Sequence, residues 1–176
     1  GRSDAEDACR AEGLARSQKD RAENLMIVDL MRNDLARVSR PGSVNVPQLC
    51  AVETFANVHH LVSTVQGRLR EELGAADLLA AAFPPGSITG APKVQAMKVI
   101  AHYEAPRGPF FGSVFCAGFD GSLDSSVLIR TVALTEDTAG WTFEARAGGG
   151  IVADSDPVEE RRETEAKIAA VLRALS

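Results

Sequence analysis

The chain has 176 residues, of which 45% are hydrophobic and 24% are charged, and its formal net charge is −5. This composition is typical of one ordinary globular domain with a sizeable core, and it excludes a disordered or collagen-like chain. The negative charge argues against nucleic acid or an anionic membrane surface as a partner, so an anionic substrate needs local positive charge.

Cysteine usage and hydropathy narrow the class further. The three cysteines are widely separated and form no CxxC motif, and no apolar run approaches the roughly 20 residues that span a bilayer. We therefore expect a cytoplasmic protein with reduced thiols, no zinc site and no membrane partner.

Residues 3–38 show helical periodicity, with Gly13 as the expected break between two helices. Apolar residues at 25–31 cover most of the second helix, which predicts a helix buried on several sides. Glu23 lies at the edge of this apolar zone. A buried carboxylate stays ionised only if it is paired, hydrogen-bonded or metal-bound, although a solvated glutamate is the commoner case.

After a turn at residues 40–43, β-strands are predicted at residues 44–46, 49–56 and 61–69. Two adjacent histidines, His59 and His60, precede the last of these strands. Neighbouring side chains on an extended chain point to opposite faces, so only one of the two can face a given site. For either histidine alone, a structural or surface role is commoner than catalysis.

A short helix at residues 75–83 is followed by the strongest break in the sequence, Phe83-Pro-Pro-Gly-Ser-Ile-Thr-Gly-Ala-Pro-Lys93. Its prolines and glycines predict a tight connection, in which the hydroxyls of Ser87 and Thr89 could bond either the backbone or a ligand. Pro92 fits the first position of the next helix, which should end near Tyr103. The spacing of a P-loop is absent.

The remaining third predicts antiparallel sheet, with strands at residues 111–119, 126–135 and 141–147. Arg130 falls within the apolar run of the second strand. An arginine on a buried strand needs an anionic partner, and the residues leave a ligand and a structural ion pair equally open.

Three consecutive glycines, at residues 148–150, lead into a helix start that is rich in carboxylates. Glycine allows a ligand to approach the backbone N–H groups closely and permits φ > 0. Asp156 is the predicted N-cap, Pro157 the first helical residue and Glu159 the partner in a capping box.

On the helix that follows, Glu160, Glu163 and Lys167 share one face because they lie three and then four residues apart. Two carboxylates beside a glycine loop could hold a hard divalent cation together with an anionic ligand. The same residues also suit a salt-bridged surface helix, which is the commoner case for such a stretch alone.

Five stretches, in this order, resemble the chorismate-utilising enzymes, a family that includes anthranilate, aminodeoxychorismate, isochorismate and salicylate synthases. The stretches are Lys19-Asp-Arg-Ala-Glu-Asn-Leu-Met-Ile-Val-Asp-Leu30, Val58-His-His-Leu-Val-Ser63, Gly86-Ser-Ile-Thr-Gly-Ala-Pro-Lys93, Ile129-Arg-Thr131, and Gly148-Gly-Gly-Ile-Val-Ala-Asp-Ser-Asp-Pro157 followed by Glu163-Thr164. The resemblance covers essentially the whole chain. It implies an α+β fold of the chorismate-binding type, antiparallel sheets with helices packed outside, of which residues 1–176 form the C-terminal two-thirds of the catalytic domain.

The resemblance also implies the site. It assigns a magnesium ion to Glu23 and Glu163, and catalytic roles to His60, Glu160 and Lys167. It places the following residues at the substrate: Ser87, Thr89, Phe111, Arg130, Gly148, Gly149, Gly150 and Lys167. Phe111 departs from the family, which frequently has tyrosine there, so the hydroxyl toward the substrate is missing.

Within the family, the paired histidines and the triple-glycine loop are more similar to component I of aminodeoxychorismate synthases. That resemblance implies amination of chorismate at C4 to 4-amino-4-deoxychorismate, for para-aminobenzoate and folate synthesis, with ammonia from a glutamine amidotransferase. The alternatives are anthranilate synthase component I, which eliminates pyruvate, and a non-catalytic chorismate-binding or regulatory fragment.

In the aminodeoxychorismate type, the lysine that attacks chorismate lies in a Pro-Ile-Lys-Gly-Thr segment, which does not occur in these 176 residues. The chain also begins at Gly1 rather than at methionine. We therefore expect a C-terminal piece with no turnover of its own. Open sheet edges in such a piece favour dimers or aggregates.

Overall fold

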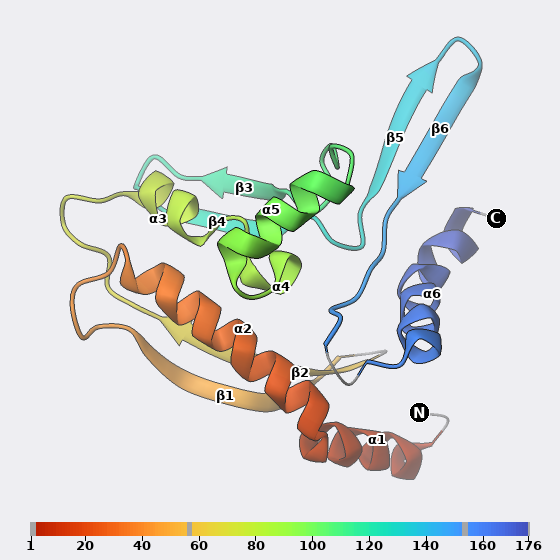
Figure 1. Cartoon of the computed structure of the whole chain (residues 1–176), viewed down its shortest axis with the longest axis horizontal. Helices are drawn as coiled ribbons and strands as arrows, with labels where there is room; N and C mark the ends of the chain where they lie inside the picture. Colours follow the sequence, from red (N-terminus) through yellow and green to blue (C-terminus); the bar gives the residue numbers. More distant parts are fainter. Residues whose placement is uncertain (1–2, 56–57, 153–154, 176) are drawn as a thin grey trace. The chain divides into compact units, whose positions relative to one another are not determined.

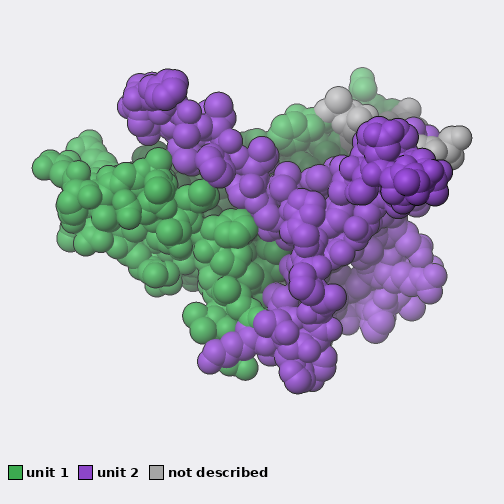
Figure 2. All heavy atoms as spheres, turned by 90° about the horizontal axis from the view of Figure 1, so that it is seen from above, with its two compact units in different colours: residues 1–97 green, residues 98–176 purple. Residues whose placement is uncertain are grey.

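The computed structural model describes residues 3–55, 58–152 and 155–175. The chain divides into two compact units, unit 1 (residues 1–97) and unit 2 (residues 98–176), which are coloured separately in Figure 2. Each unit combines helix with antiparallel strands (Figure 1), which agrees with the predicted α+β class.

The elements of unit 1 are α1 (Asp4–Arg16), α2 (Gln18–Ala36), β1 (Asn45–Thr54), β2 (His59–Gln66), α3 (Ala75–Ala82), α4 (Gly86–Thr89) and the first part of α5 (Lys93–Tyr103). The elements of unit 2 are the rest of α5, β3 (Ser113–Ala117), β4 (Leu123–Val127), β5 (Val132–Asp137), β6 (Gly140–Ala145) and α6 (Pro157–Leu175). Strands pair only within consecutive hairpins in the described residues: β1 with β2, β3 with β4, and β5 with β6.

The break between α1 and α2 falls at Ser17, so the prediction of a break at Gly13 is wrong. Ser17 has extended backbone angles, and its hydroxyl accepts a hydrogen bond from the Asp20 N–H at 3.3 Å. Serine is among the favoured N-cap residues, and this bond satisfies one of the free N–H groups at the helix start. Gly13 stays inside α1, because a single glycine costs a helix only about 1 kcal/mol relative to alanine.

Residues 45–54 form one strand where two were predicted. β1 pairs antiparallel with β2, with Thr54 opposite His59. Two register shifts between residues 45 and 51 account for the interrupted alternation in the sequence, because a bulge adds a residue without ending the pairing. Ala56, the predicted end of the second strand, lies outside the described residues.

Helix α2 lies across the β1–β2 hairpin (Figure 1), and the side chain of Asn24 fixes it there. The Asn24 amide donates to the Leu61 carbonyl at 3.0 Å. Its oxygen accepts from the Ser63 hydroxyl and, at 3.4 Å, from the Cys50 thiol. These bonds set the position of the neighbouring Glu23 relative to β2.

The prediction that α2 is buried on several sides is wrong. Val28 is 5% exposed, but Leu25 is 49% exposed. Within the described residues, the buried apolar side chains are few: Val28, Val38, Cys50, Ala81 and Phe110. None of the described helices is both long enough and apolar enough to cross a bilayer.

The connection at residues 83–92 contains the short helix α4, which the sequence did not predict. Gly86 begins this helix and packs against α2: a Cβ atom on Gly86 would lie 2.5 Å from Leu30 Cδ1. The Pro92 carbonyl accepts from the Ala96 N–H at 2.9 Å, so Pro92 precedes α5 instead of being its first residue. The peptide bonds before Pro84 and Pro92 are cis.

In unit 2, the predicted strand at residues 126–135 is two strands, β4 and β5, separated by residues 128–131. Arg130 lies in this gap with φ of +52°, a left-handed conformation that no regular strand accommodates. The prediction of Arg130 on a strand is therefore wrong.

Candidate functional site

The predicted site residues belong to both units, and each group is described within its own unit. Those in unit 1 are Glu23, His60, Ser87 and Thr89. Those in unit 2 are Phe111, Arg130, Gly148, Gly149, Gly150, Glu160, Glu163 and Lys167.

The start of α6 is built as the sequence predicts, by Asp156. Its carboxylate accepts hydrogen bonds from the N–H groups of Val158, at 2.9 Å, and Glu159, at 3.0 Å. The capping box, however, is not formed, because the Glu159 carboxylate accepts from Arg162 at 2.6 Å. Asp156 therefore caps the first turn of α6, the helix that carries Glu160 and Glu163. Ala153 and Asp154, in the same motif, lie outside the described residues.

Glu160 is a buried carboxylate, only 8% exposed. The Ser155 hydroxyl donates to Glu160 Oε1 at 2.6 Å and also accepts from the Val152 N–H at 3.0 Å. A Cβ atom at Gly149 would lie 3.2 Å from Glu160 Oε2, closer than most side chains tolerate. The glycine at this position therefore lets the carboxylate lie against the loop.

Lys167 links the glycine loop to α6. Its ammonium donates to the Gly148 carbonyl at 3.0 Å and pairs with the Glu163 carboxylate at 2.6 Å. The i, i+4 ion pair predicted from the sequence is thus present. Lys167 Nζ also lies 3.8 Å from the position of a Cβ atom on Gly149. One cation therefore contacts both a loop carbonyl and a helix carboxylate.

Arg130 joins the same group of residues from outside α6. Its guanidinium donates to the main-chain carbonyl of Lys167 at 3.4 Å, and the side chain is exposed. Of the two partners left open by the sequence, a structural ion pair is not observed in the described residues. Unit 2 therefore brings Arg130, Gly148, Gly149, Glu160, Glu163 and Lys167 together.

The three loop glycines are not left-handed. None of Gly148, Gly149 and Gly150 has a positive φ, so the conformational freedom predicted for them is not used. At Gly149 the missing side chain matters, because it leaves room for the Glu160 carboxylate.

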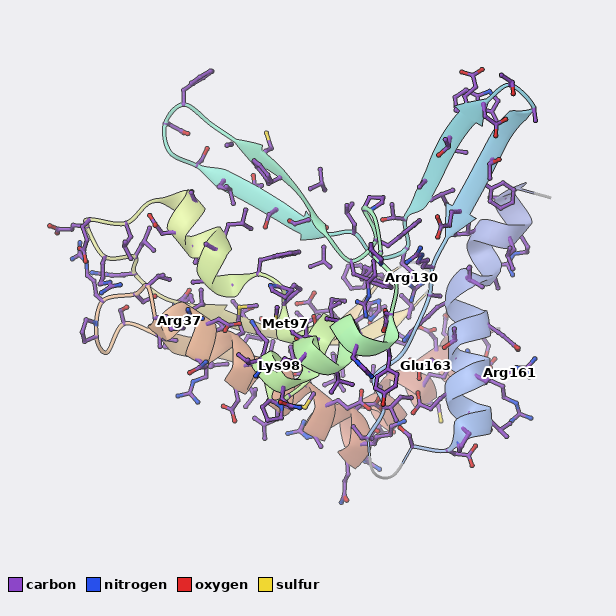
Figure 3. All side chains as sticks on the ribbon, turned by 45° about the horizontal axis from the view of Figure 1, so that its top comes forward. Arg37, Met97, Lys98, Arg130, Arg161 and Glu163 are labelled. Atoms are coloured by element: carbon purple, nitrogen blue, oxygen red, sulfur yellow. The ribbon has the colours of Figure 1, made fainter. Side chains whose placement is uncertain are left out.

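Glu163 is exposed on the side of α6 that also carries Lys167. Figure 3 shows the Glu163 and Arg161 side chains on opposite sides of the helix, as residues two apart must lie. Arg161 pairs with Glu165 at 2.8 Å, which forms a second i, i+4 pair on the other side. Glu165 is therefore a natural comparison for Glu163.

Phe111 is half-buried, with φ of +60°. The Arg107 guanidinium lies 5.1 Å from the centre of its ring and donates two hydrogen bonds to Glu104, at 2.7 and 2.9 Å. These bonds from Arg107 lower the pKa of the Glu104 carboxyl. The ring is thereby held in place, although it supplies no hydroxyl.

In unit 1, the two adjacent histidines have different partners. His59 Nδ1 is 3.0 Å from the Thr54 hydroxyl, and its Nε2 is 3.2 Å from the Asp7 carboxylate. His60 is exposed and makes an edge contact with Phe55, with ring centres 5.6 Å apart. The opposite orientations predicted from the strand pattern are present, and His60 is the one that faces solvent.

Glu23 is half-buried on α2, as its place at the edge of the apolar zone predicts. Ser87 is exposed on α4. The Thr89 hydroxyl donates to the carbonyls of Pro85, at 3.3 Å, and Gly90, at 3.4 Å, so it bonds the backbone. Of the two hydroxyls, Ser87 is the better placed to meet a ligand.

Sequence reasoning missed three structural residues, two in unit 1 and one in unit 2. Asn24, Ser63 and Ser155 hold the elements that carry Glu23, His60 and Glu160. The signal was present, since each is a small polar residue inside one of the five family stretches.

A pocket of about 360 Å³ lies between α2 and β2 in unit 1. Its lining is formed by Asn24, Ile27, Val28, Met31, Ser63, Thr64 and Val65, and includes none of the predicted site residues. No cluster of three or more potential metal ligands occurs among the residues that the structure describes.

Comparison with known proteins identifies the family. A family model described as chorismate binding enzyme matches residues 1–173. This chain belongs to the chorismate-binding enzymes. The α+β class implied by the five stretches is thus confirmed.

The chain is 54% identical over 171 residues to aminodeoxychorismate synthase component 1 of Klebsiella aerogenes, covering 97% of this chain and 37% of that protein. It is 44% identical over 176 residues to anthranilate synthase component 1 of Geobacillus stearothermophilus, covering 99% of this chain and 34% of that protein.

A crystal structure of anthranilate synthase component I from Streptococcus pneumoniae is similar, with a TM-score of 0.80 and 39% identity. This match covers 93% of the chain and 37% of that structure. The chain therefore spans only 37% of the length of the aminodeoxychorismate synthase component that it matches.

Proposed function

We propose that this chain is part of component I of an aminodeoxychorismate synthase. The reaction replaces the C4 hydroxyl of chorismate with an amino group from ammonia, giving 4-amino-4-deoxychorismate and water. The observation that carries the proposal is the 54% identity to an aminodeoxychorismate synthase component, against 44% to an anthranilate synthase component. The product then serves para-aminobenzoate and folate synthesis.

The site that we propose binds Mg²⁺ through Glu23 and Glu163. Their oxygen atoms are ligands of the kind this hard ion prefers, and Mg²⁺ commonly combines one or two carboxylates with substrate oxygens and water. When bound, the ion would neutralise the ring carboxylate of chorismate and assist departure of the hydroxyl. Glu160 lies one turn before Glu163 on α6, where it would act through water.

The remaining residues of the proposed site bind and orient the substrate. Lys167, held between Gly148 and Glu163, brings positive charge to the glycine loop, where the substrate carboxylates would bind. Arg130 offers an exposed guanidinium from the adjacent segment, and a planar fork suits a carboxylate. His60 and Ser87 are exposed polar groups of unit 1, whereas Phe111 contributes only its ring.

Two participants of the proposed reaction lie outside these 176 residues. One is the lysine that attacks C2 of chorismate, for which the family uses a Pro-Ile-Lys-Gly-Thr segment. The other is a glutamine amidotransferase that supplies ammonia; the name component 1 of the relatives is consistent with a partner component.

Identification of the reaction product tests the proposed function. The full-length parent protein, supplied with chorismate, Mg²⁺ and ammonium, should form 4-amino-4-deoxychorismate without releasing pyruvate. Chromatography of the products with an enzymatic assay for pyruvate measures both outcomes. Anthranilate with one pyruvate per turnover would establish the alternative function. Binding of chorismate by calorimetry without any product would indicate a non-catalytic binder.

The metal ligands are tested in the same assay. Glu163→Gln should raise the Mg²⁺ concentration for half-maximal rate by about tenfold or more, because a neutral amide is a weaker ligand for a hard cation. Glu165→Gln is the matched control, since Glu165 also forms an exposed i, i+4 pair on α6. Equal Mg²⁺ requirements in the two variants would remove Glu163 from the metal site.

A further inference from the structure

Two contacts attach the segment at residues 86–92 to helix α2, one at each end. At the first end, Gly86 lies against Leu30, with no room for a Cβ atom. At the second end, the Lys93 ammonium donates to the Asp34 carboxylate. Ser87 lies between these two attachments.

The Asp34–Lys93 pair is buried, unlike most other ion pairs of the described residues. Asp34 is 2% exposed, and the Lys93 side chain is 15% exposed. The arginine–carboxylate pairs described in unit 1, such as Arg40–Glu71, are on the surface. A buried pair is a poor source of stability, because desolvation of both charges offsets their attraction. The role of the ion pair is therefore to attach residues 86–92 to α2, and not to add stability.

The attachments share one face of α2 with the proposed metal ligand. Glu23, Leu30 and Asp34 are separated by seven and four residues, which returns the side chain to nearly the same direction around the helix. Asp34 lies about 16 Å along the axis from Glu23, at 1.5 Å per residue. Helix α2 thus fixes the distance along its axis between Glu23 and the segment that carries Ser87.

We propose that the Asp34–Lys93 ion pair and the Leu30–Gly86 contact are a positioning device, which holds residues 86–92 in register with Glu23 along one face of α2. The device touches neither substrate nor metal. It sets the place of Ser87, while Asn24 sets the place of α2 on β2. The inference rests on the proposed function, because that function makes Ser87 and Glu23 site residues.

A double-mutant cycle in the full-length protein tests the ion pair. The variants are Asp34→Asn, Lys93→Met and the double variant, measured for thermal stability, amide hydrogen exchange and chorismate kinetics. Removing both charges leaves no unpaired buried charge, so the double variant should melt close to the wild-type temperature. Exchange should nevertheless accelerate at residues 86–92 and not in the β1–β2 hairpin. The KM for chorismate should rise about tenfold to a hundredfold, the range expected when a positioning contact is lost.

A glycine pair provides a second test, which does not depend on the charges. Gly86→Ala forces residue 86 away from Leu30, whereas Gly13→Ala places the same methyl group in open space within α1. Gly86→Ala should raise the KM for chorismate and the exchange at residues 86–92, and Gly13→Ala should change neither.

The outcomes separate this inference from the proposed function. An inactive wild-type protein would contradict the proposed function, and the exchange data alone would then decide whether the device holds the segment. If the wild-type protein is active, and folded double and Gly86→Ala variants keep both KM and exchange at wild-type values, the positioning inference is wrong. Loss in the single variants with full recovery in the double variant also overturns it, since that pattern reports only an unpaired buried charge.

Discussion

His59 and His60 are adjacent residues with different chemical surroundings. His59 lies between the Thr54 hydroxyl and the Asp7 carboxylate, which tie it to α1 and to β1. His60 makes no such polar contact in the described part of the chain, and its ring is exposed beside Phe55. The two-residue period of a strand predicts that the two side chains point to opposite faces. Only the packing of α1 decides which histidine gains a carboxylate partner.

This difference gives a prediction for paired substitutions in the full-length protein. His60→Gln should lower kcat/KM for chorismate by about a hundredfold, the scale of a lost acid or base group, with little change in melting temperature. His59→Gln should mainly lower the melting temperature, because it removes the contact to Asp7. Steady-state kinetics and thermal unfolding measure the two effects. The assignment is contradicted if His59→Gln carries the larger kinetic loss while remaining folded.

At the scale of elements, α6 shows how one residue directs a whole helix toward the site. Asp156 accepts hydrogen bonds from two N–H groups of the first turn, which carries Glu160, and the two following turns carry Glu163 and Lys167. An acidic N-cap also interacts favourably with the positive end of the helix dipole. The cap was predictable because its residue types are local signals. The pairing of Glu159 with Arg162 was not predictable, because Glu159 lies three residues from both Asp156 and Arg162.

Asp156→Ala should therefore affect both stability and metal use. Loss of the cap costs about 1 kcal/mol, and fraying of the first turn should raise the Mg²⁺ concentration needed for activity. Ser3→Ala is the matched control, because Ser3 caps α1, which carries no predicted site residue. Thermal unfolding and Mg²⁺ titration of the full-length variants provide the comparison. An equal change of the Mg²⁺ requirement in both variants would show that the Asp156 cap does not act on the metal site.

The strands of this chain were predicted less accurately than its helices. The helices at residues 75–82 and 93–103 end within a residue of their expected positions, because proline, glycine and caps are read locally. The strand predicted through Arg130 is instead two strands, and β1 joins two predicted ones. Apolar runs do not encode bulges or left-handed residues, which arise when distant segments pair.

At the scale of the whole molecule, much apolar surface stays uncovered. Among the described residues, large hydrophobic side chains on the hairpins of unit 2 are exposed, including Phe115 at 57% and Trp141 at 65%. Each described sheet has only two strands, so backbone groups at its outer edges remain unpaired. Isolated two-stranded hairpins are marginally stable, and open edges tend to pair with other chains.

We therefore predict that the purified 176-residue chain self-associates and shows no turnover of chorismate. Static light scattering over a concentration series measures the mass, and a chorismate-consumption assay measures turnover. The full-length protein is the control for both. A monodisperse monomer would contradict the role assigned to the open edges, and product formation by the 176-residue chain would contradict the need for a lysine outside it.

The sequence by itself determined the class of fold, the family and most of the helix boundaries, because these depend on local residue patterns and on ordered motifs. It also grouped Glu160, Glu163 and Lys167, since helical spacing fixes their common face. Only the tertiary structure decided that Arg130, in a left-handed conformation, reaches Lys167, that Gly149 makes room for Glu160, and that the Asp34–Lys93 pair attaches one end of residues 86–92 to α2. Each of these contacts joins residues that are distant in the chain, and no local pattern records which distant residues will meet.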